Sequence, residues 1–171
     1  MSEDPLNKQK LVPYLVNHIE GFSDLKNVKK FSIGQSNPTF LLETDTNSYV
    51  IRRKPDGPLL KSAHAIDREY RVQKALYNTP VPVAKMLHYC NDDSILGVEF
   101  YVMEFVDGIV YEDPALPGLT NSDRQKVFSE INRGLSSLHE VDIETVGLTD
   151  FGAEGNYYCL LYTSPSPRDG T

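Results

Sequence analysis

Residues 49–72 read YVIRRKPDGPLLKSAHAIDREYRV and join a short strand to a helix that carries a carboxylate, Glu69, on its apolar side. Burying an unpaired ionised group is costly, so Glu69 needs a cation on the surface against which this helix packs. Side chains alternate along a strand, which puts Arg52 and Arg53 on opposite faces; we favour Arg52 as the partner, with Arg53 as the alternative. A surface ion pair with any nearby base is the other interpretation, and it would contribute little.

The segments before and after this unit predict a small sheet. An N-terminal helix is expected over residues 5–20, with Pro13 causing a kink or a late start and Gly21 ending the helix. Alternating apolar residues bounded by turn residues predict five strands, in the segments 27–34, 38–45, 49–54, 83–90 and 98–106. The order is three strands, one helix and two strands.

Two further helices and a connector between them predict that the chain is divided into two lobes. The central helix is expected over residues 62–77, with Ser62 as its N-cap. A connector at 107–118, rich in proline and glycine, marks the boundary between lobes. Thr120, with Asp123 three residues later, resembles a capping box that opens an amphipathic helix ending near His139.

Composition limits the possible functions. The chain has 171 residues, 40% of them hydrophobic, so its length and composition suffice for one globular core. Its net charge is −7. Scattered Lys and Arg argue against a nucleic-acid partner. No apolar run approaches a membrane span, and the first residues resemble neither a signal nor a transit peptide, so we expect a chain that is not secreted. Cys90 and Cys159 form neither a disulfide framework nor a metal cluster, and Cys90 is expected to be a buried strand residue.

Two further segments are compatible with nucleotide binding. The loop with Gly34, Gln35, Ser36 and Asn37 lies between two predicted strands and offers backbone N–H groups and small polar side chains to phosphates. It is equally compatible with a plain hairpin turn. The strand in residues 100–108, FYVMEFVDG, runs into the connector and could offer backbone groups to a planar base, or be only a core strand.

Together these pieces resemble the small lobe of the kinase-like fold, an α+β fold with a five-stranded antiparallel sheet and one packed helix. The sequence resembles the aminoglycoside phosphotransferase-like family, and most closely the N-terminal domain of acyl-CoA dehydrogenase family members ten and eleven. The segments that carry the resemblance are IGQSNPTFLLET, YVIRRKPDG, SAHAIDREYRV, FYVMEFVDG and VGLTDFGAEGNYY, within about residues 10–158.

The resemblance implies roles for individual residues. Arg52 stands where the family usually has a lysine that contacts the α- and β-phosphates of ATP, and Glu69 is its acid partner. The loop residues Gly34, Gln35, Ser36 and Asn37 would cover the phosphates. The gatekeeper and the backbone groups for adenine would come from Met103, Glu104 and Val106.

The chemical step needs residues that the resemblance does not supply. The family uses an H-G-D-x-x-x-x-N loop and a later aspartate that binds Mg²⁺, and the nearest candidates, His139 and Asp142, have no asparagine in register. Asp150 begins an Asp-Phe-Gly tripeptide, but nothing catalytic precedes it. We therefore expect Asp150 to be a turn or capping residue and assign no catalytic or metal-binding residue.

The end of the sequence differs from the rest. Residues 159–171 resemble the translated read-through of a sequencing-library adapter, with a disordered Ser/Pro-rich tail as the alternative. The expected division is an N-terminal helix and linker at 1–27, the small lobe at 28–107, and a hinge connector with the start of the large lobe at 108–158.

The expected function follows from the resemblance. The chain is interpreted as the nucleotide-binding fragment of an ATP- and Mg²⁺-dependent phosphotransferase that acts on a small-molecule hydroxyl, with hydroxy-acyl-CoA as a candidate, and the fragment itself is expected to be inactive. The alternative is a regulatory or scaffold module of an acyl-CoA dehydrogenase. FAD enters only through a fused dehydrogenase domain, and the resemblance suggests a mitochondrial or peroxisomal compartment. The apolar face of the last helix should make the isolated chain poorly soluble or partly molten.

Overall fold

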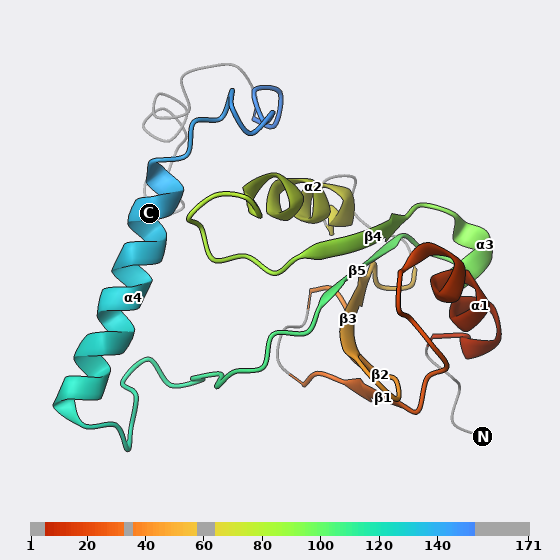
Figure 1. Cartoon of the computed structure of the whole chain (residues 1–171), viewed down its shortest axis with the longest axis horizontal. Coiled ribbons are helices and arrows are strands. Elements are labelled where there is room, and N and C mark those ends of the chain that lie inside the picture. Colours follow the sequence, from red (N-terminus) through yellow and green to blue (C-terminus); the bar gives the residue numbers. More distant parts are fainter. Residues whose placement is uncertain (1–5, 33–35, 58–63, 153–171) are drawn as a thin grey trace, which may run out of the picture.

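The computed structural model describes residues 6–32, 36–57 and 64–152. Five strands form one antiparallel sheet in the order β1-β2-β3-β5-β4, and helices lie on both of its faces (Figure 1). The strands are β1 (Asn27–Lys30), β2 (Thr39–Glu43), β3 (Ser48–Arg53), β4 (Met86–Cys90) and β5 (Phe100–Glu104). The helices are α1 (Lys8–His18), α2 (Ile66–Leu76), α3 (Asp93–Leu96) and α4 (Asn121–His139). The predicted α+β class is confirmed.

The two faces of the sheet have separate cores because side chains alternate along each strand. The α1 side holds the larger cluster, in which Leu11 and Leu15 of α1 pack with Ile51 and Phe100. The α2 side holds a small cluster of Ile66, Met86 and Tyr101, with partly buried residues around it. The central strand β3 is therefore covered on both faces, and α2 rests on a thin apolar layer.

Some boundaries differ from the prediction. The central helix begins at Ile66, not near Ser62, because His64 has a left-handed backbone (φ 60°) that interrupts the helical path. Ala65 occupies the N-cap position, and Ser62 lies outside the described residues. The turn expected before β5 contains α3, in which Asp92 accepts a hydrogen bond from the Ser94 N–H at 2.8 Å.

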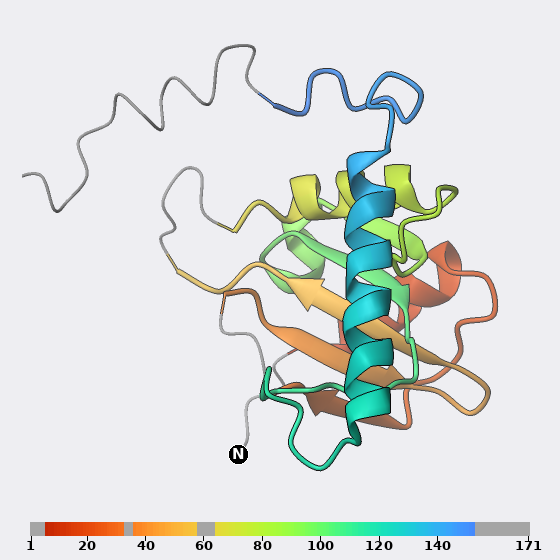
Figure 2. The same cartoon turned by 90° about the vertical axis from the view of Figure 1, so that its left-hand side faces the viewer.

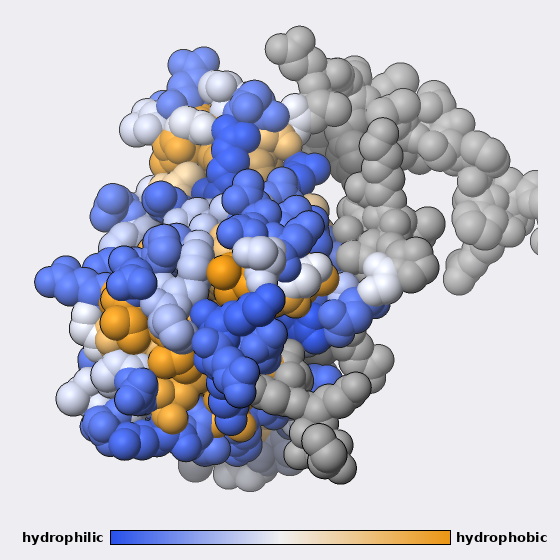
Figure 3. Space-filling model, turned by 90° about the vertical axis from the view of Figure 1, so that its right-hand side faces the viewer, coloured by the Kyte–Doolittle hydropathy of each residue, from blue (hydrophilic) through white to orange (hydrophobic). Residues whose placement is uncertain are grey.

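The N-terminal helix is shorter than the 5–20 range expected. It spans Lys8–His18 and retains Pro13 as an interior residue. Cys90 is buried in β4, as predicted. The face on the side of α1 and α3 is mostly hydrophilic, with hydrophobic residues showing only in separate patches (Figure 3).

The helix α4 begins as predicted. Thr120 is its N-cap, and its Oγ1 accepts a hydrogen bond from the Asp123 N–H at 3.2 Å. The helix stands at one side of the sheet in Figure 1 and crosses in front of it in Figure 2. Its apolar residues stay 44 to 57% exposed: Phe128, Ile131, Leu135 and Leu138. Among the described residues, no helix has the length and apolarity that crossing a membrane requires.

Two isoleucines on different elements test this assignment of the core. Ile51 is fully buried in β3, whereas Ile131 on α4 is 57% exposed. Ile51→Ala should lower the free energy of unfolding by about 2–5 kcal/mol, and Ile131→Ala should change it by less than about 0.5 kcal/mol. Urea unfolding followed by circular dichroism measures both. Equal effects of the two substitutions would contradict the assignment of Ile51 to a well-packed core.

Candidate functional site

The predicted ion pair between Arg52 and Glu69 forms. Arg52 lies on the α2 face of β3, and its Nε donates to Glu69 Oε2 at 2.7 Å. Arg53 points to the opposite face, where its two terminal nitrogens bind the Asp56 carboxylate at 2.8 and 2.7 Å. The choice of Arg52 over Arg53 is confirmed, and strand alternation is the reason for it.

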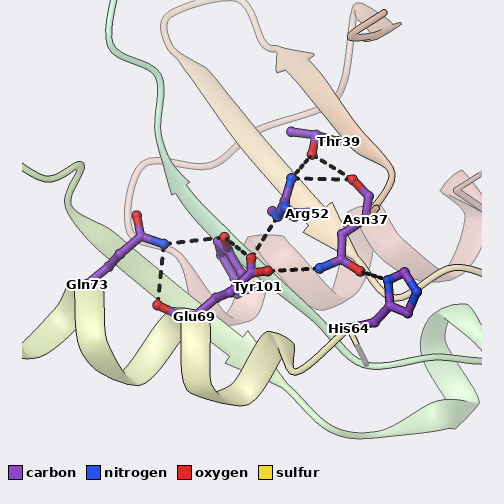
Figure 4. Close-up of polar contacts among 7 residues, drawn as sticks. All are labelled: Asn37, Thr39, Arg52, His64, Glu69, Gln73 and Tyr101. Atoms are coloured by element: carbon purple, nitrogen blue, oxygen red, sulfur yellow. Dashed lines mark hydrogen bonds and ion pairs between the residues drawn. The ribbon is translucent and has the colours of Figure 1, made fainter. Parts of the chain in front are cut away.

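Glu69 is held by donors from three separate segments (Figure 4). Besides Arg52, Tyr101 of β5 donates its hydroxyl to Oε2 at 3.1 Å, and Asn37 donates Nδ2 to Oε1 at 2.9 Å. The side chains of Arg52 and Glu69 remain 25% and 34% exposed, so water reaches one side of the pair. The carboxylate is thus satisfied as an anion without being sealed from a ligand.

Asn37 lies at the end of the loop and is buried, with only 1% of its surface exposed. Its Oδ1 bonds to His64 Nδ1 at 2.8 Å. Because Asn37 uses its NH₂ group for Glu69, His64 must be the donor and carries its proton on Nδ1. The Asn37 carbonyl accepts from Arg52 Nη1 at 3.3 Å. The Asn37 side chain is therefore committed to the helix and is not a free phosphate donor.

Only part of the predicted phosphate loop lies within the described residues. Gly34 and Gln35 lie outside the described residues, and Ser36 is exposed at the rim of a cavity of about 480 Å³. The cavity is bounded by the end of the loop, the start of α2 and a residue that follows α4. Its lining includes Asn37, His64, Arg68, Glu69 and Phe151. The ion pair therefore borders a cavity through Glu69.

Tyr101 and Gln73 complete the polar network. Gln73, one turn after Glu69, donates to the Glu69 carbonyl at 3.3 Å and to the Tyr101 hydroxyl at 3.5 Å. Burial, together with the Glu69 charge, raises the pKa of Tyr101 to about 12. Tyr101 therefore stays protonated and keeps donating to Glu69 at neutral pH.

The predicted hinge residues lie at the end of β5. Met103 pairs with Val50 and packs beside the Met86 and Tyr101 cluster, on the same face as Arg52. The Glu104 N–H donates to the Lys85 carbonyl at 3.0 Å, so this amide belongs to the sheet. Val106 follows the strand and is 64% exposed. Met103 and Arg52 share one face, while the contacts proposed for Glu104 and Val106 stay predictions.

Asp150 lies in a turn and binds Arg71 of α2 in a two-bond ion pair. The hydrogen bond from Arg71 holds the pKa of Asp150 below its usual value. Within the ranges 6–32, 36–57 and 64–152, no group of three or more His, Cys, Asp or Glu is arranged to hold a metal ion. The Asp-Phe-Gly tripeptide does not fit a magnesium site, because its one acid, Asp150, is already paired with Arg71.

Sequence reasoning found the ion pair but missed its supports. Tyr101 faces Arg52 directly across the β3–β5 pair, so strand alternation with the correct register would have found it. His64 and the inward turn of Asn37 depend on loop backbone angles, for which the sequence carries no signal.

A five-stranded antiparallel sheet with one packed helix, joined by a strand cation and a helix carboxylate, defines the small lobe of the kinase-like fold. The Phosphotransferase enzyme family matches residues 27–162, and the chain belongs to this family. The match includes residues 159–162 of the segment expected to be non-native. The expected tail itself, with Cys159, lies outside the described residues.

The relatives agree with this assignment. Mouse acyl-CoA dehydrogenase family member 10 is 47% identical over 75% of this chain, and mouse member 11 is 43% identical over 90% of it. These matches cover only 12% and 20% of the two relatives, so the chain spans a minor part of their length. The predicted resemblance is confirmed.

Two solved structures share the fold. A crystal structure from Ralstonia eutropha JMP134, provisionally named an aminoglycoside phosphotransferase, is 41% identical with a TM-score of 0.74 and covers 93% of this chain and 49% of its own. A thermostable mutant of aminoglycoside phosphotransferase APH(4)-Ia, solved with AMP-PNP and hygromycin B, is 12% identical with a TM-score of 0.53. It covers 79% of this chain and 40% of its own, and at this identity it supports the fold alone.

A double-mutant cycle tests the central ion pair. Arg52→Met, Glu69→Gln and the double variant should give a coupling free energy of about 1–3 kcal/mol in urea unfolding. The value is below that of a fully buried pair because water reaches both side chains. The matched control is the exposed pair Glu130 and Arg133 within α4, which should show no measurable coupling. Equal coupling for the two pairs would mean that the Arg52 contact is an ordinary surface pair.

The raised pKa of Tyr101 predicts a loss of stability at alkaline pH. A tyrosine in the unfolded chain loses its proton near pH 10, whereas Tyr101 in the folded chain keeps it until about pH 12. Its contribution is therefore complete below pH 10 and is lost as the pH rises toward 12. Tyr101→Phe should make the unfolding free energy fall less steeply between these pH values. Tyr111→Phe, at an exposed ring, is the control. An unchanged slope in Tyr101→Phe would show that the pKa of Tyr101 is not raised in the folded chain.

Proposed function

We propose that this chain forms the nucleotide-binding part of an ATP-dependent phosphotransferase that acts on a small-molecule hydroxyl. The observation that carries the proposal is the Arg52–Glu69 pair, whose Glu69 side chain lines a cavity together with Asn37 at the end of the loop. Membership of the Phosphotransferase enzyme family supports it. An ATP-type nucleotide is proposed by analogy with the neighbour of the same fold that was solved with AMP-PNP.

In this proposal Arg52 contacts the phosphates and Glu69 fixes its direction. The bonds to Glu69, Asn37 and Thr39 use Nε and Nη1 of Arg52. Nη2 has no hydrogen-bond partner among the described residues, and we propose that it meets a phosphate oxygen. A guanidinium held at three points is preorganised, and it therefore loses little freedom when the nucleotide arrives. Backbone N–H groups of residues 34–37 would complete the phosphate contacts.

The adenine would lie at the other end of the same face. Met103 is the proposed gatekeeper, because it lies on the same face of the sheet as Arg52 and packs against the apolar cluster there. Val106 follows the strand with its backbone near the surface, and Glu104 would contribute its carbonyl, because its N–H already serves the sheet. These positions are expected from the family resemblance.

The chemical step would need residues outside these 171. The sequence contains no H-G-D-x-x-x-x-N loop, and Asp142, the nearest candidate base, caps a turn through Thr145 and the Glu144 N–H. The base and the Mg²⁺ ligand would come from a larger protein of which this sequence is a part. From the family resemblance of the sequence, that protein would act on a small-molecule hydroxyl, with hydroxy-acyl-CoA as a candidate substrate. The resemblance also implies FAD only in a fused dehydrogenase domain and a mitochondrial or peroxisomal compartment.

One observation favours a second candidate, a regulatory or scaffold module that does not transfer phosphate. Arg52 replaces the usual lysine, and two of its nitrogens are committed to internal bonds. A cation used this way would stabilise the fold even if no nucleotide bound. A regulatory pseudokinase that binds nucleotide differs from the first candidate in lacking phosphoryl transfer, whereas a scaffold module differs in not binding ATP.

Calorimetric titration with ATP, with and without Mg²⁺, tests the proposal. Arg52→Met should weaken ATP binding by at least about tenfold, because a charge-assisted phosphate contact is lost. Arg133→Met, which removes an exposed arginine of α4, should leave the affinity unchanged. If the unmodified chain does not bind ATP at millimolar concentration, the scaffold candidate is favoured. Metal-dependent phosphoryl transfer by these 171 residues would contradict the expectation that the chain itself is inactive.

A further inference from the structure

The helix that carries Glu69 is held on two sides. Toward the sheet, only Ile66 and Leu76 of α2 are buried, and the apolar cluster beneath the helix is small. On another side, Arg68 and Arg71 contact the turn that follows α4. Arg68 and Arg71 are three residues apart and share one face, while Arg71 and Glu69 are two residues apart and point in nearly opposite directions.

The contacts with this turn form a network. Arg71 Nη1 donates to Asp150 Oδ2 at 3.1 Å, and its Nη2 donates to Asp150 Oδ1 and, at 3.1 Å, to the Gly147 carbonyl. Arg68 Nη2 donates to the Phe151 carbonyl at 2.7 Å, and its guanidinium carbon lies 4.5 Å from the centre of the Phe151 ring. Five contacts thus join two helix residues to one short segment.

This segment belongs to a distant part of the chain. Residues 147–151 follow α4, beyond the connector, and the blue segment after α4 lies on the outer side of α2 in both views (Figures 1 and 2). Phe151 also lines the cavity that Glu69 and Asn37 border. The same turn therefore touches the outer face of α2 and the edge of the proposed phosphate pocket.

We infer that Arg71 and Asp150 are positioning residues: they hold α2 at the orientation in which Glu69 meets Arg52. The Asp-Phe-Gly tripeptide then acts as a brace between the segment after α4 and the nucleotide-facing helix. An exposed ion pair alone contributes little, but two arginines that bind a carboxylate, two carbonyls and a ring share the constraint. The consequence for phosphate binding rests on the proposed function, whereas the brace itself can be measured without nucleotide.

Hydrogen exchange of the chain without nucleotide tests the brace. Asp150→Asn keeps the shape of the side chain but removes its charge. Arg71→Gln removes both the charge and the guanidinium from the helix side. Each should speed exchange of the α2 amides by about threefold or more, because opening of a local segment depends on its own contacts, and should leave β3 and β5 unchanged. The reversed pair, Arg71→Asp with Asp150→Arg, should restore slow exchange. Glu130→Gln, at an exposed Arg–carboxylate pair inside α4, is the matched control.

The same variants are then titrated with ATP. Asp150→Asn should weaken binding about three- to tenfold, and the reversed pair should recover most of the loss. Unchanged α2 exchange in Asp150→Asn, or faster exchange throughout the sheet, overturns the inference whatever ATP does. Faster α2 exchange in a chain that never binds ATP leaves the brace standing and removes the proposed function. Faster α2 exchange with unaltered ATP affinity overturns the link to the phosphate site.

Discussion

The structure around the site depends on the need to satisfy one carboxylate on the apolar side of a helix. Glu69 cannot lie between α2 and the sheet unless donors reach both of its oxygens. The donors come from the loop before β2, from β3 and from β5, through Asn37, Arg52 and Tyr101. Each donor is itself held: Arg52 by Thr39, Tyr101 by Gln73, and Asn37 by His64. A single half-buried charge thereby fixes the relative positions of four segments.

This arrangement explains how a thin apolar layer can hold a functional helix. The cluster under α2 has three buried residues, far fewer than the cluster on the α1 face. Polar contacts therefore determine the orientation of α2 more than apolar packing does. Hydrogen bonds to a charged group are directional, whereas apolar contact tolerates sliding.

The sequence predicts those parts of the fold that follow from the short repeat of side-chain directions along a helix or a strand. Glu69 was recognised because it interrupts a helical apolar pattern, and Arg52 was favoured over Arg53 in a strand whose side chains alternate. The strands, α4 and its Thr120 cap follow from the same kind of local pattern. The start of α2 was placed too early because the left-handed backbone of His64 has no signature in a residue of that type.

The polar supports of the site could not be predicted, for a related reason. Whether Asn37 points outward to a phosphate or inward to Glu69 is decided by the path of the loop, and both orientations suit an asparagine. His64 enters the network only because the chain turns back immediately before α2. Contacts between segments more than 25 residues apart follow from tertiary geometry, which the local pattern constrains only weakly.

The Asp-Phe-Gly tripeptide shows how the same residues take different roles in different surroundings. A carboxylate binds Mg²⁺ when other oxygen ligands converge on it and no cation competes. Asp150 instead faces a guanidinium that engages both of its oxygens, and this neighbour lowers its pKa. A divalent cation placed there would be repelled by Arg71 and would have to displace two hydrogen bonds. The charge of Asp150 is thus used to join two segments of the chain. Its partner Arg71 lies on α2, two residues from Glu69, and connects that junction to the proposed nucleotide site.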